Sequence, residues 1–158
     1  MDETDLRHLR RAVELAGEAL DAGDEPFGSV LVAADGTVLF EGHNEVSGGD
    51  GTRHPELAIA QWAASRMPAE ERAAATVYTS GEHCPMCAAA HAWAGLGRIV
   101  YASSSEQLTA WRESWGLPPG PVRPLPVTEV APDVPVEGPV PELAEAVRAL
   151  HARFTDRS

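Results

Sequence analysis

Two short motifs constrain this chain more than any other feature: H-P-E at residues 54–56 and C-P-M-C at residues 84–87. An imidazole and two thiolates form a donor set suited to zinc, and three protein ligands leave one tetrahedral position open for water. Zinc binding makes such a water acidic near neutral pH. Glu56, two residues past the histidine, is placed to move the protons that a hydrolysis requires. The sequence therefore predicts one zinc ion per chain, bound by His54, Cys84 and Cys87.

Two other interpretations of these motifs stay open on the residues alone. His91, four residues after Cys87 and on the same helical face, can supply a fourth ligand, and a closed site of four protein ligands is structural. Glu56 would then be only an acidic residue in the first turn of a helix. A redox C-x-x-C is the other interpretation, but that motif usually opens the first helix of a thioredoxin-like unit, and here it comes late. A disulfide framework is disfavoured because both cysteines of the chain lie inside this one motif.

Length and charge narrow the class of protein. The chain has 158 residues, 44% of them apolar, which predicts a single domain over residues 1–158 with a buried core. Twenty-four acidic residues oppose 12 basic ones, all arginines, for a net charge of −12, so a small uncharged base is favoured over a nucleic acid. No apolar run approaches the length that spans a membrane. The acidic N-terminus is unlike a secretory signal, which predicts a cytoplasmic protein.

Helical and strand patterns alternate through the first two thirds of the chain. Two successive strand–helix–strand units predict that the later strands are parallel, with right-handed crossovers. Residues 69–75 are predicted to be a polar connection rich in alanine. The predicted helices cover residues 3–22, 54–66 and 85–94, and the predicted strands cover residues 27–33, 37–41, 76–79 and 98–102.

The character of the sequence changes after residue 111. Nine of the 13 prolines lie in residues 118–141, so this segment is predicted to be extended, with an edge strand near residues 127–130. A last amphipathic helix is predicted over residues 141–154, with Leu143, Val147 and Phe154 on one face.

The two metal motifs resemble the H-x-E and P-C-x-x-C signature of the zinc-dependent cytidine deaminase superfamily. His83 stands where that family usually has proline, which affects the turn but no ligand. Within the superfamily the resemblance is to the guanine deaminase and tRNA-adenosine deaminase branch, and it covers roughly residues 5–110. It implies a three-layer α/β/α fold with a mixed sheet of about five strands. The segments that carry it are Glu25–Gly28, Gly42–Asn44, Thr79–Glu82 and Cys84–Trp93.

The resemblance also implies an activity and an assembly. The implied reaction is hydrolytic deamination of a free nucleobase or related amino-heterocycle, with guanine as the type and isoguanine, cytosine or an amino-triazine as analogues. A tRNA adenosine deaminase and a non-catalytic structural zinc module are the alternatives. Because related enzymes pack as dimers, we expect a homodimer. The proline-rich segment is long enough to swap the C-terminal helix onto a partner.

Several residues are implied to contact substrate, each with a plainer alternative. Asn44 is expected to hydrogen-bond the base, although an asparagine beside glycine is often a turn residue. Glu82 is expected to be a supporting acid or base, or else a loop carboxylate. Phe27 and Trp93 are expected to stack on the base, or else to be core aromatics. At the C-terminus two residues are expected to close over the site, or else to be a packed ring and a frayed end: Phe154 and Asp156.

Overall fold

The computed structural model describes residues 1–157, with side chains described through residue 156. Its five described strands form one mixed sheet in the order β2-β1-β3-β4-β5. β1 pairs antiparallel with β2 and β3, whereas β3, β4 and β5 run parallel to one another. The prediction of a mixed sheet of about five strands is therefore confirmed. The strands are β1 Gly28–Val32, β2 Val38–His43, β3 Thr76–Gly81, β4 Ile99–Ser103 and β5 Val136–Glu137.

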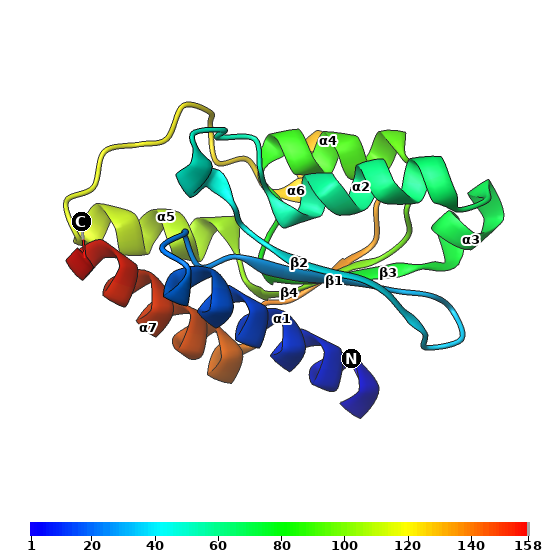
Figure 1. Cartoon of the computed structure of the whole chain (residues 1–158), viewed down its shortest axis with the longest axis horizontal. Coiled ribbons are helices and arrows are strands. Elements are labelled where there is room, and N and C mark those ends of the chain that lie inside the picture. The colour runs from blue at the N-terminus through cyan, green and yellow to red at the C-terminus, as the bar shows by residue number, and fades with distance from the viewer. Residues whose placement is uncertain (158) are drawn as a thin grey trace.

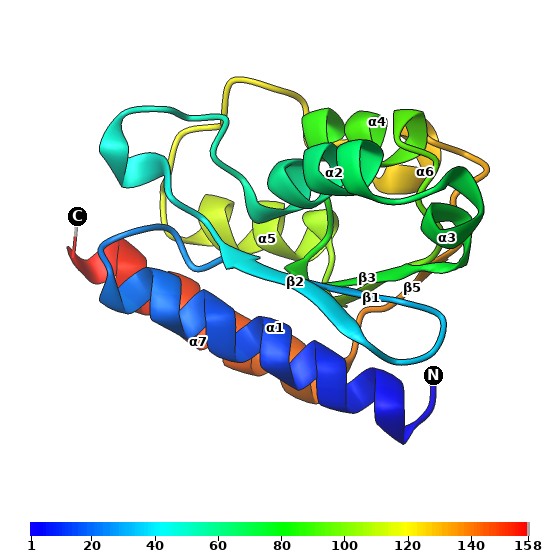
Figure 2. The same ribbon diagram turned by 45° about the vertical axis from the view of Figure 1, so that its right-hand side comes forward.

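Helices cover both faces of the sheet, which confirms the predicted three-layer arrangement (Figures 1 and 2). α1 and α7 pack side by side on one face, and α2, α4 and α6 lie on the other. α5 follows β4 directly. None of the helices within residues 1–157 is both long and apolar enough to cross a membrane. The helices are α1 Glu3–Asp21, η1 Val46–Gly48, α2 Pro55–Arg66, α3 Ala69–Ala74, α4 Pro85–Trp93, α5 Ser105–Ser114, α6 Val127–Val130 and α7 Pro141–Arg157.

The central strands are apolar on both faces because each face packs against helices. Val30 and Val100 join the cluster under α1 and α7, which also contains Leu9. The neighbouring residues Leu31 and Val77 point the other way and pack with Ile59 of α2. Successive side chains of a strand project to opposite faces, so one short apolar run supplies both cores.

A partly buried ion pair fixes α1 to the sheet. The Asp5 carboxylate lies 2.6 Å from a guanidinium nitrogen of Arg98 and accepts a 2.6 Å hydrogen bond from the Tyr78 hydroxyl. Burial opposes the charged carboxylate, but the hydrogen bonds from Arg98 and Tyr78 outweigh it and lower the pKa of Asp5. The start of α1 is thereby anchored to β3 and to the residue that precedes β4.

Two predictions for the connecting segments are wrong. Residues 127–130 form the short helix α6 and no edge strand, because Val127 and Val130 lie three residues apart and both pack beside Ile99. The edge strand is β5, a few residues later. Residues 69–74 form α3, where Pro68 precedes the first turn and acidic residues within that turn favour a helix.

α7 lies against its own chain. It contacts α1 and β4, and its Val147 is fully buried in the same cluster as Leu9 of α1. This face of the sheet is therefore covered without help from a second subunit, and a swap of the C-terminal helix is not needed to complete the fold.

A histidine of α7 makes stability sensitive to acid. His151 is 5% exposed and packs against the rings of Phe27 and Trp111. Burial lowers the pKa of His151 to about 4. In the unfolded chain the His151 imidazole has a pKa of about 6.5, so the unfolded state binds a proton at a higher pH than the folded state does. The contribution of neutral His151 to the unfolding free energy is therefore fully present above the unfolded-state pKa. It is lost as the pH falls from there toward about 4.

We predict that His151→Leu removes this part of the acid sensitivity. Between pH 7 and pH 4 the wild type should lose up to about 3 kcal/mol more unfolding free energy than the variant. Urea unfolding followed by circular dichroism at several pH values measures the difference. His43→Gln, at the end of β2, is the control and should keep the wild-type slope. Parallel pH curves for wild type and His151→Leu would contradict the assignment.

Candidate active site

Two of the three candidate metal ligands occupy the same place on two different helices. His54 is the N-cap of α2 and Cys84 is the N-cap of α4, and each is followed by a proline at the first helical position. A residue before proline is held in an extended conformation, and proline at the first turn costs no hydrogen bond. Neither side chain caps its own helix, so both are free to bind a ligand.

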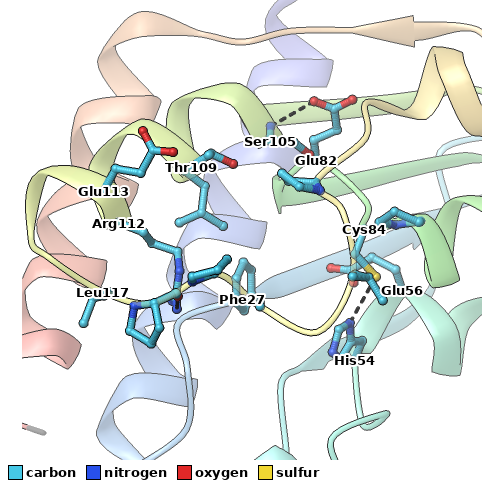
Figure 3. A pocket seen from close by; sticks show the side chains of 17 residues that line it. Phe27, His54, Glu56, Glu82, Cys84, Ser105, Thr109, Arg112, Glu113 and Leu117 are labelled. Atoms are coloured by element: carbon cyan, nitrogen blue, oxygen red, sulfur yellow. Dashed lines mark hydrogen bonds between the residues drawn. The ribbon is translucent and has the colours of Figure 1, made fainter.

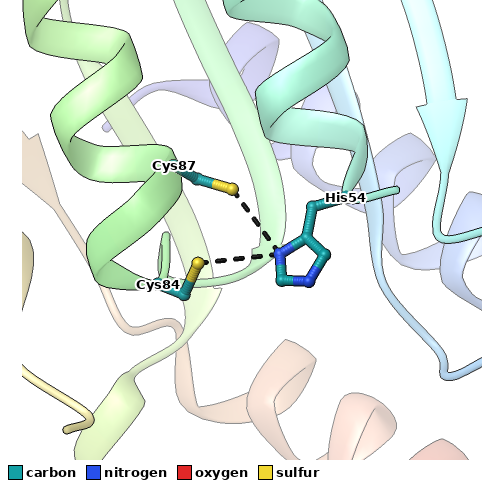
Figure 4. Close-up of side chains that lie close together, drawn as sticks. All are labelled: His54, Cys84 and Cys87. Atoms are coloured by element: carbon teal, nitrogen blue, oxygen red, sulfur yellow. Dashed lines mark hydrogen bonds between the residues drawn. The ribbon is translucent and has the colours of Figure 1, made fainter. Parts of the chain in front are cut away.

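The ligand atoms form a compact cluster (Figure 4). His54 Nδ1 lies 3.6 Å from Cys84 Sγ and 3.5 Å from Cys87 Sγ. Zinc–sulfur and zinc–nitrogen bonds of ordinary length, at a tetrahedral angle, separate nitrogen from sulfur by about 3.6 Å. The three residues are thus placed to hold a zinc ion, and their spacing fits it.

His91 does not join this cluster. Its Nε2 lies 2.7 Å from the Gly97 carbonyl oxygen, and the group of ligand atoms contains only His54, Cys84 and Cys87 among the described residues. The geometry therefore does not support a closed site with His91 as the fourth protein ligand. One coordination position is left for a water or a substrate.

The environment favours a thiolate at Cys84. Hydrogen bonds from the Cys87 thiol and from His54 lower the pKa of Cys84 to about 4, although burial opposes the shift. The hydrogen bond with Cys84 in turn raises the pKa of His54. The N-terminus of α4, where backbone N–H groups have no helical partner, adds a field that favours negative sulfur.

Glu56 lies in the first turn of α2, beside the cluster. It is 5% exposed, and its Oε1 lies 2.9 Å from the Ser29 hydroxyl and 3.1 Å from the Thr79 hydroxyl. Burial raises the pKa of Glu56, and the charge of His54 partly offsets this. A buried carboxyl with a raised pKa, fixed through one oxygen, is suited to accept and return a proton.

A cavity of about 320 Å³ opens over the cluster (Figure 3). Its floor contains His54, Glu56 and Cys84, and the Phe27 ring lies between this floor and the residues of α5. A methyl group on Gly81 would meet the Phe27 ring at 3.3 Å, so glycine there leaves space for the ring. The size and mostly apolar lining are those of a small-molecule site.

Glu82 also lines the cavity, but its carboxylate is already engaged. Oε1 accepts a 3.0 Å hydrogen bond from the Ser105 amide, and Oε2 accepts a 2.8 Å hydrogen bond from the Val127 amide. These contacts support a positioning role, because they hold the start of α5 and the start of α6 to the loop before Cys84. An acid or base role for Glu82 stays a prediction.

The other expected substrate contacts are placed differently. Asn44 is 2% exposed, and its Oδ1 accepts a 3.0 Å hydrogen bond from the Val46 amide, so it serves as a turn residue and does not line the cavity. Phe154 is half-buried and Asp156 is exposed, and neither lines the cavity. Within one chain the tail does not close the site.

Trp93 does not line the cavity of its own chain, so its stacking on a substrate stays a prediction. Trp93 is 91% exposed. It is the last residue of α4, about 12 Å along the axis from Pro85, which lines the cavity at the other end. It also lies two residues past the buried His91, which turns it to the opposite side of the helix.

Sequence reasoning missed the residues that form the outer wall of the cavity. The only signal was the helical spacing of four α5 residues at i, i+3, i+4 and i+7. Their side chains are chemically mixed, so no motif marked them. Those residues are Ser105, Leu108, Thr109 and Arg112, and the chain after α5 adds Leu117, Pro118, Pro119, Gly120, Val122 and Pro124.

Loss of one cysteine should release the metal. Cys87→Ser is expected to bind zinc at least tenfold more weakly and to unfold at lower temperature, because metal binding and folding are coupled. A ligand present at a thousand times its dissociation constant contributes about 4 kcal/mol. Elemental analysis and thermal unfolding measure both effects. Met86→Leu, in the same helical turn, is the matched control, and retention of full zinc by Cys87→Ser would exclude this cluster as the site.

Replacing Glu82 should loosen the wall and leave the metal bound. Glu82→Gln puts an amide donor against a backbone donor, at a cost of about 1–3 kcal/mol. Hydrogen exchange should show faster exchange at the amides of Ser105 and Val127 while zinc content is unchanged. Glu129→Gln, exposed on α6, should change stability by less than about 0.5 kcal/mol. Unchanged protection of both amides would rule out the positioning role.

Known proteins resemble the chain over the part that carries this site. It is 36% identical over 109 residues to "Probable cytosine deaminase" of Schizosaccharomyces pombe, covering 68% of this chain and 65% of that protein. It is 32% identical over 103 residues to "tRNA-specific adenosine deaminase" of Haemophilus influenzae, covering 65% of this chain and 60% of that protein. The match thus spans a little under two thirds of each relative.

A solved structure extends the likeness over more of the fold. The X-ray structure of guanine deaminase from Bacillus subtilis superposes with a TM-score of 0.60 at 32% identity, covering 80% of this chain and 83% of that chain. Residues 2–103 match the family model described as "Cytidine and deoxycytidylate deaminase zinc-binding region". Those residues contain all three candidate ligands and Glu56. The chain therefore belongs to the cytidine and deoxycytidylate deaminase zinc-binding family.

Proposed function

We propose that this protein is a zinc-dependent hydrolase that removes an amino group, as ammonia, from a free nucleobase or a closely related amino-heterocycle. The observation that carries the proposal is the position of Glu56. This buried carboxyl, with a raised pKa, lies beside a cluster of three metal ligands at the floor of a small cavity. A purely structural metal site has no need of such a group.

The proposed reaction uses Glu56 twice. A zinc ion, when bound, supplies a Lewis acid that makes water a nucleophile near neutral pH. Glu56 takes a proton from the attacking water and returns it to a ring nitrogen of the base, and a second transfer lets the amino group leave as ammonia. Hydrogen bonds from Ser29 and Thr79 keep one carboxylate oxygen in place through these transfers.

The cavity supports a small planar substrate. Its volume of about 320 Å³ is at the lower end of the range for small-molecule sites. The Phe27 ring lines this cavity, which supports a role in packing against a flat base above the floor. The net charge of −12 also favours an uncharged base over a polyanion. Guanine is the type substrate we propose, with isoguanine, cytosine and amino-triazines as alternatives.

Deamination of adenosine in tRNA is the second candidate. The similarity to a tRNA-specific adenosine deaminase favours it, since that relative matches nearly the same length of chain as the others. The negative charge opposes it, because nucleic acid binding relies on neutralised phosphates. An ammonia-release screen with guanine, cytosine, an amino-triazine and a hairpin RNA decides between them. Preferential reaction of the RNA would overturn the proposal.

The remaining expectations stay predictions. These are a single domain over residues 1–158, a homodimer as the assembly, and a cytoplasmic location. Light scattering tests the assembly. A monomer at micromolar concentration would rule out the dimer and leave the proposed chemistry unaffected.

The proton-transfer role gives a direct prediction for Glu56→Gln. The variant keeps the shape of the side chain but cannot accept a proton, so ammonia release should fall roughly 10²- to 10⁴-fold. Zinc content should stay at the wild-type level, because Glu56 is not one of the three ligands. Glu70→Gln, on exposed α3, is the matched control and should retain activity. A turnover near the wild-type rate would refute the role of Glu56.

A further inference from the structure

The cavity has two parts of different origin. Its floor comes from residues inside the segment that matches the family, 2–103. Its outer wall comes from α5 and from residues 117–126, which we call the strap, and all of these lie beyond that segment. In Figure 1 the strap is the thin yellow coil that arches from α5 toward α6. The floor with the candidate metal ligands and the outer wall are thus separate along the sequence.

The inner surface of the wall is mostly apolar. Leu108 of α5 and three strap residues (Leu117, Val122 and Pro124) face the cavity. Val122 is 54% exposed, so its side chain gains little stabilisation from packing against the core. An apolar side chain that lines a cavity and is otherwise exposed gains free energy only when an apolar group covers it.

Several polar groups of the wall already form hydrogen bonds within the protein. The Ser105 amide donates to Glu82, and Arg112 Nη2 donates a 3.3 Å hydrogen bond to the Pro118 carbonyl. Glu113 is exposed, and Thr109 adds a single hydroxyl. Beyond these, the wall adds the Ser105 hydroxyl, so among its described residues the polar ones are fewer than the apolar ones.

The strap is fixed at its two ends and free between them. The Leu117 amide donates to the Arg112 carbonyl at 3.0 Å, and the Val127 amide donates to Glu82 at 2.8 Å. Within the described chain, residues 119–125 make no hydrogen bond outside the strap. Its prolines restrict the backbone, so the strap holds an extended shape without such bonds.

We propose that α5 and the strap form a specificity subsite that takes an apolar substituent on the ring edge facing away from the metal ligands. This inference rests on the proposed function. A base with its amino-bearing carbon at the floor would turn its opposite edge to the wall, whose lining includes Leu108 and Val122. The subsite selects an N-alkylated base over the same base carrying a ribose, whose hydroxyls would lose water against apolar side chains.

The test compares three ligands that differ only at that edge: guanine, 9-ethylguanine and guanosine, with cytosine, 1-ethylcytosine and cytidine as a parallel series. Dissociation constants are measured by calorimetry on the zinc-loaded full chain carrying Glu56→Gln, so that turnover does not interfere. Burial of an ethyl group should tighten binding roughly tenfold over the parent base, and the nucleoside should bind more weakly than the parent.

Two strap variants make the test specific. Val122→Asp places a charge in the subsite and should abolish the roughly tenfold ethyl preference. Leu125→Asp introduces the same charge on a strap residue that is 36% exposed and does not line the cavity, so the preference should persist. Thermal unfolding of both variants checks that the strap change has not unfolded the chain.

The outcomes separate this inference from the proposed function. Deamination of guanine or cytosine by the wild type, without any ethyl preference, overturns the subsite and leaves the reaction intact. An identical response of Val122→Asp and Leu125→Asp also overturns it. If the wild type releases ammonia from neither base series, the proposed function fails, and the substrate class named here fails with it.

Discussion

Two helices that begin beside each other, each with a metal ligand directly before a proline, are the constraint on which the site depends. The proline holds His54 and Cys84 in extended N-cap conformations, so both side chains leave their helices in the same way. Cys87 follows one turn later on α4. Glu56, in the first turn of α2, therefore lies beside the cluster, and Ser29 and Thr79 of the sheet hydrogen-bond it.

The parts of the molecule that were predictable from sequence are those fixed by local chemistry. The ligands and Glu56 follow from donor type and spacing, and the central strands follow from short apolar runs. Trp93 lies outside the cavity of its own chain, and helix phase alone turns it away from the buried side of α4. The surrounding prolines predict an extended edge strand near residues 127–130, whereas packing of Val127 beside Ile99 gives a helix there.

The outer wall of the cavity could not be predicted from local sequence in this way. It depends on long-range contacts, above all on Glu82, whose two oxygens join α5 and α6 to the loop before the ligands. A single glutamate gives no sequence signal for two backbone partners 23 and 45 residues away. The strap covers the cavity where the tail had been expected, so a segment without regular structure completes, with α5, the outer wall of a site whose floor lies in the family segment.

The central claim is that the metal has three protein ligands and one open position. X-ray absorption at the zinc edge of the zinc-loaded chain tests it most directly. The account predicts two sulfur ligands at about 2.3 Å and two lighter ligands at about 2.0–2.1 Å, only one of them an imidazole. A second imidazole in the coordination shell, or a shell without sulfur, would contradict it.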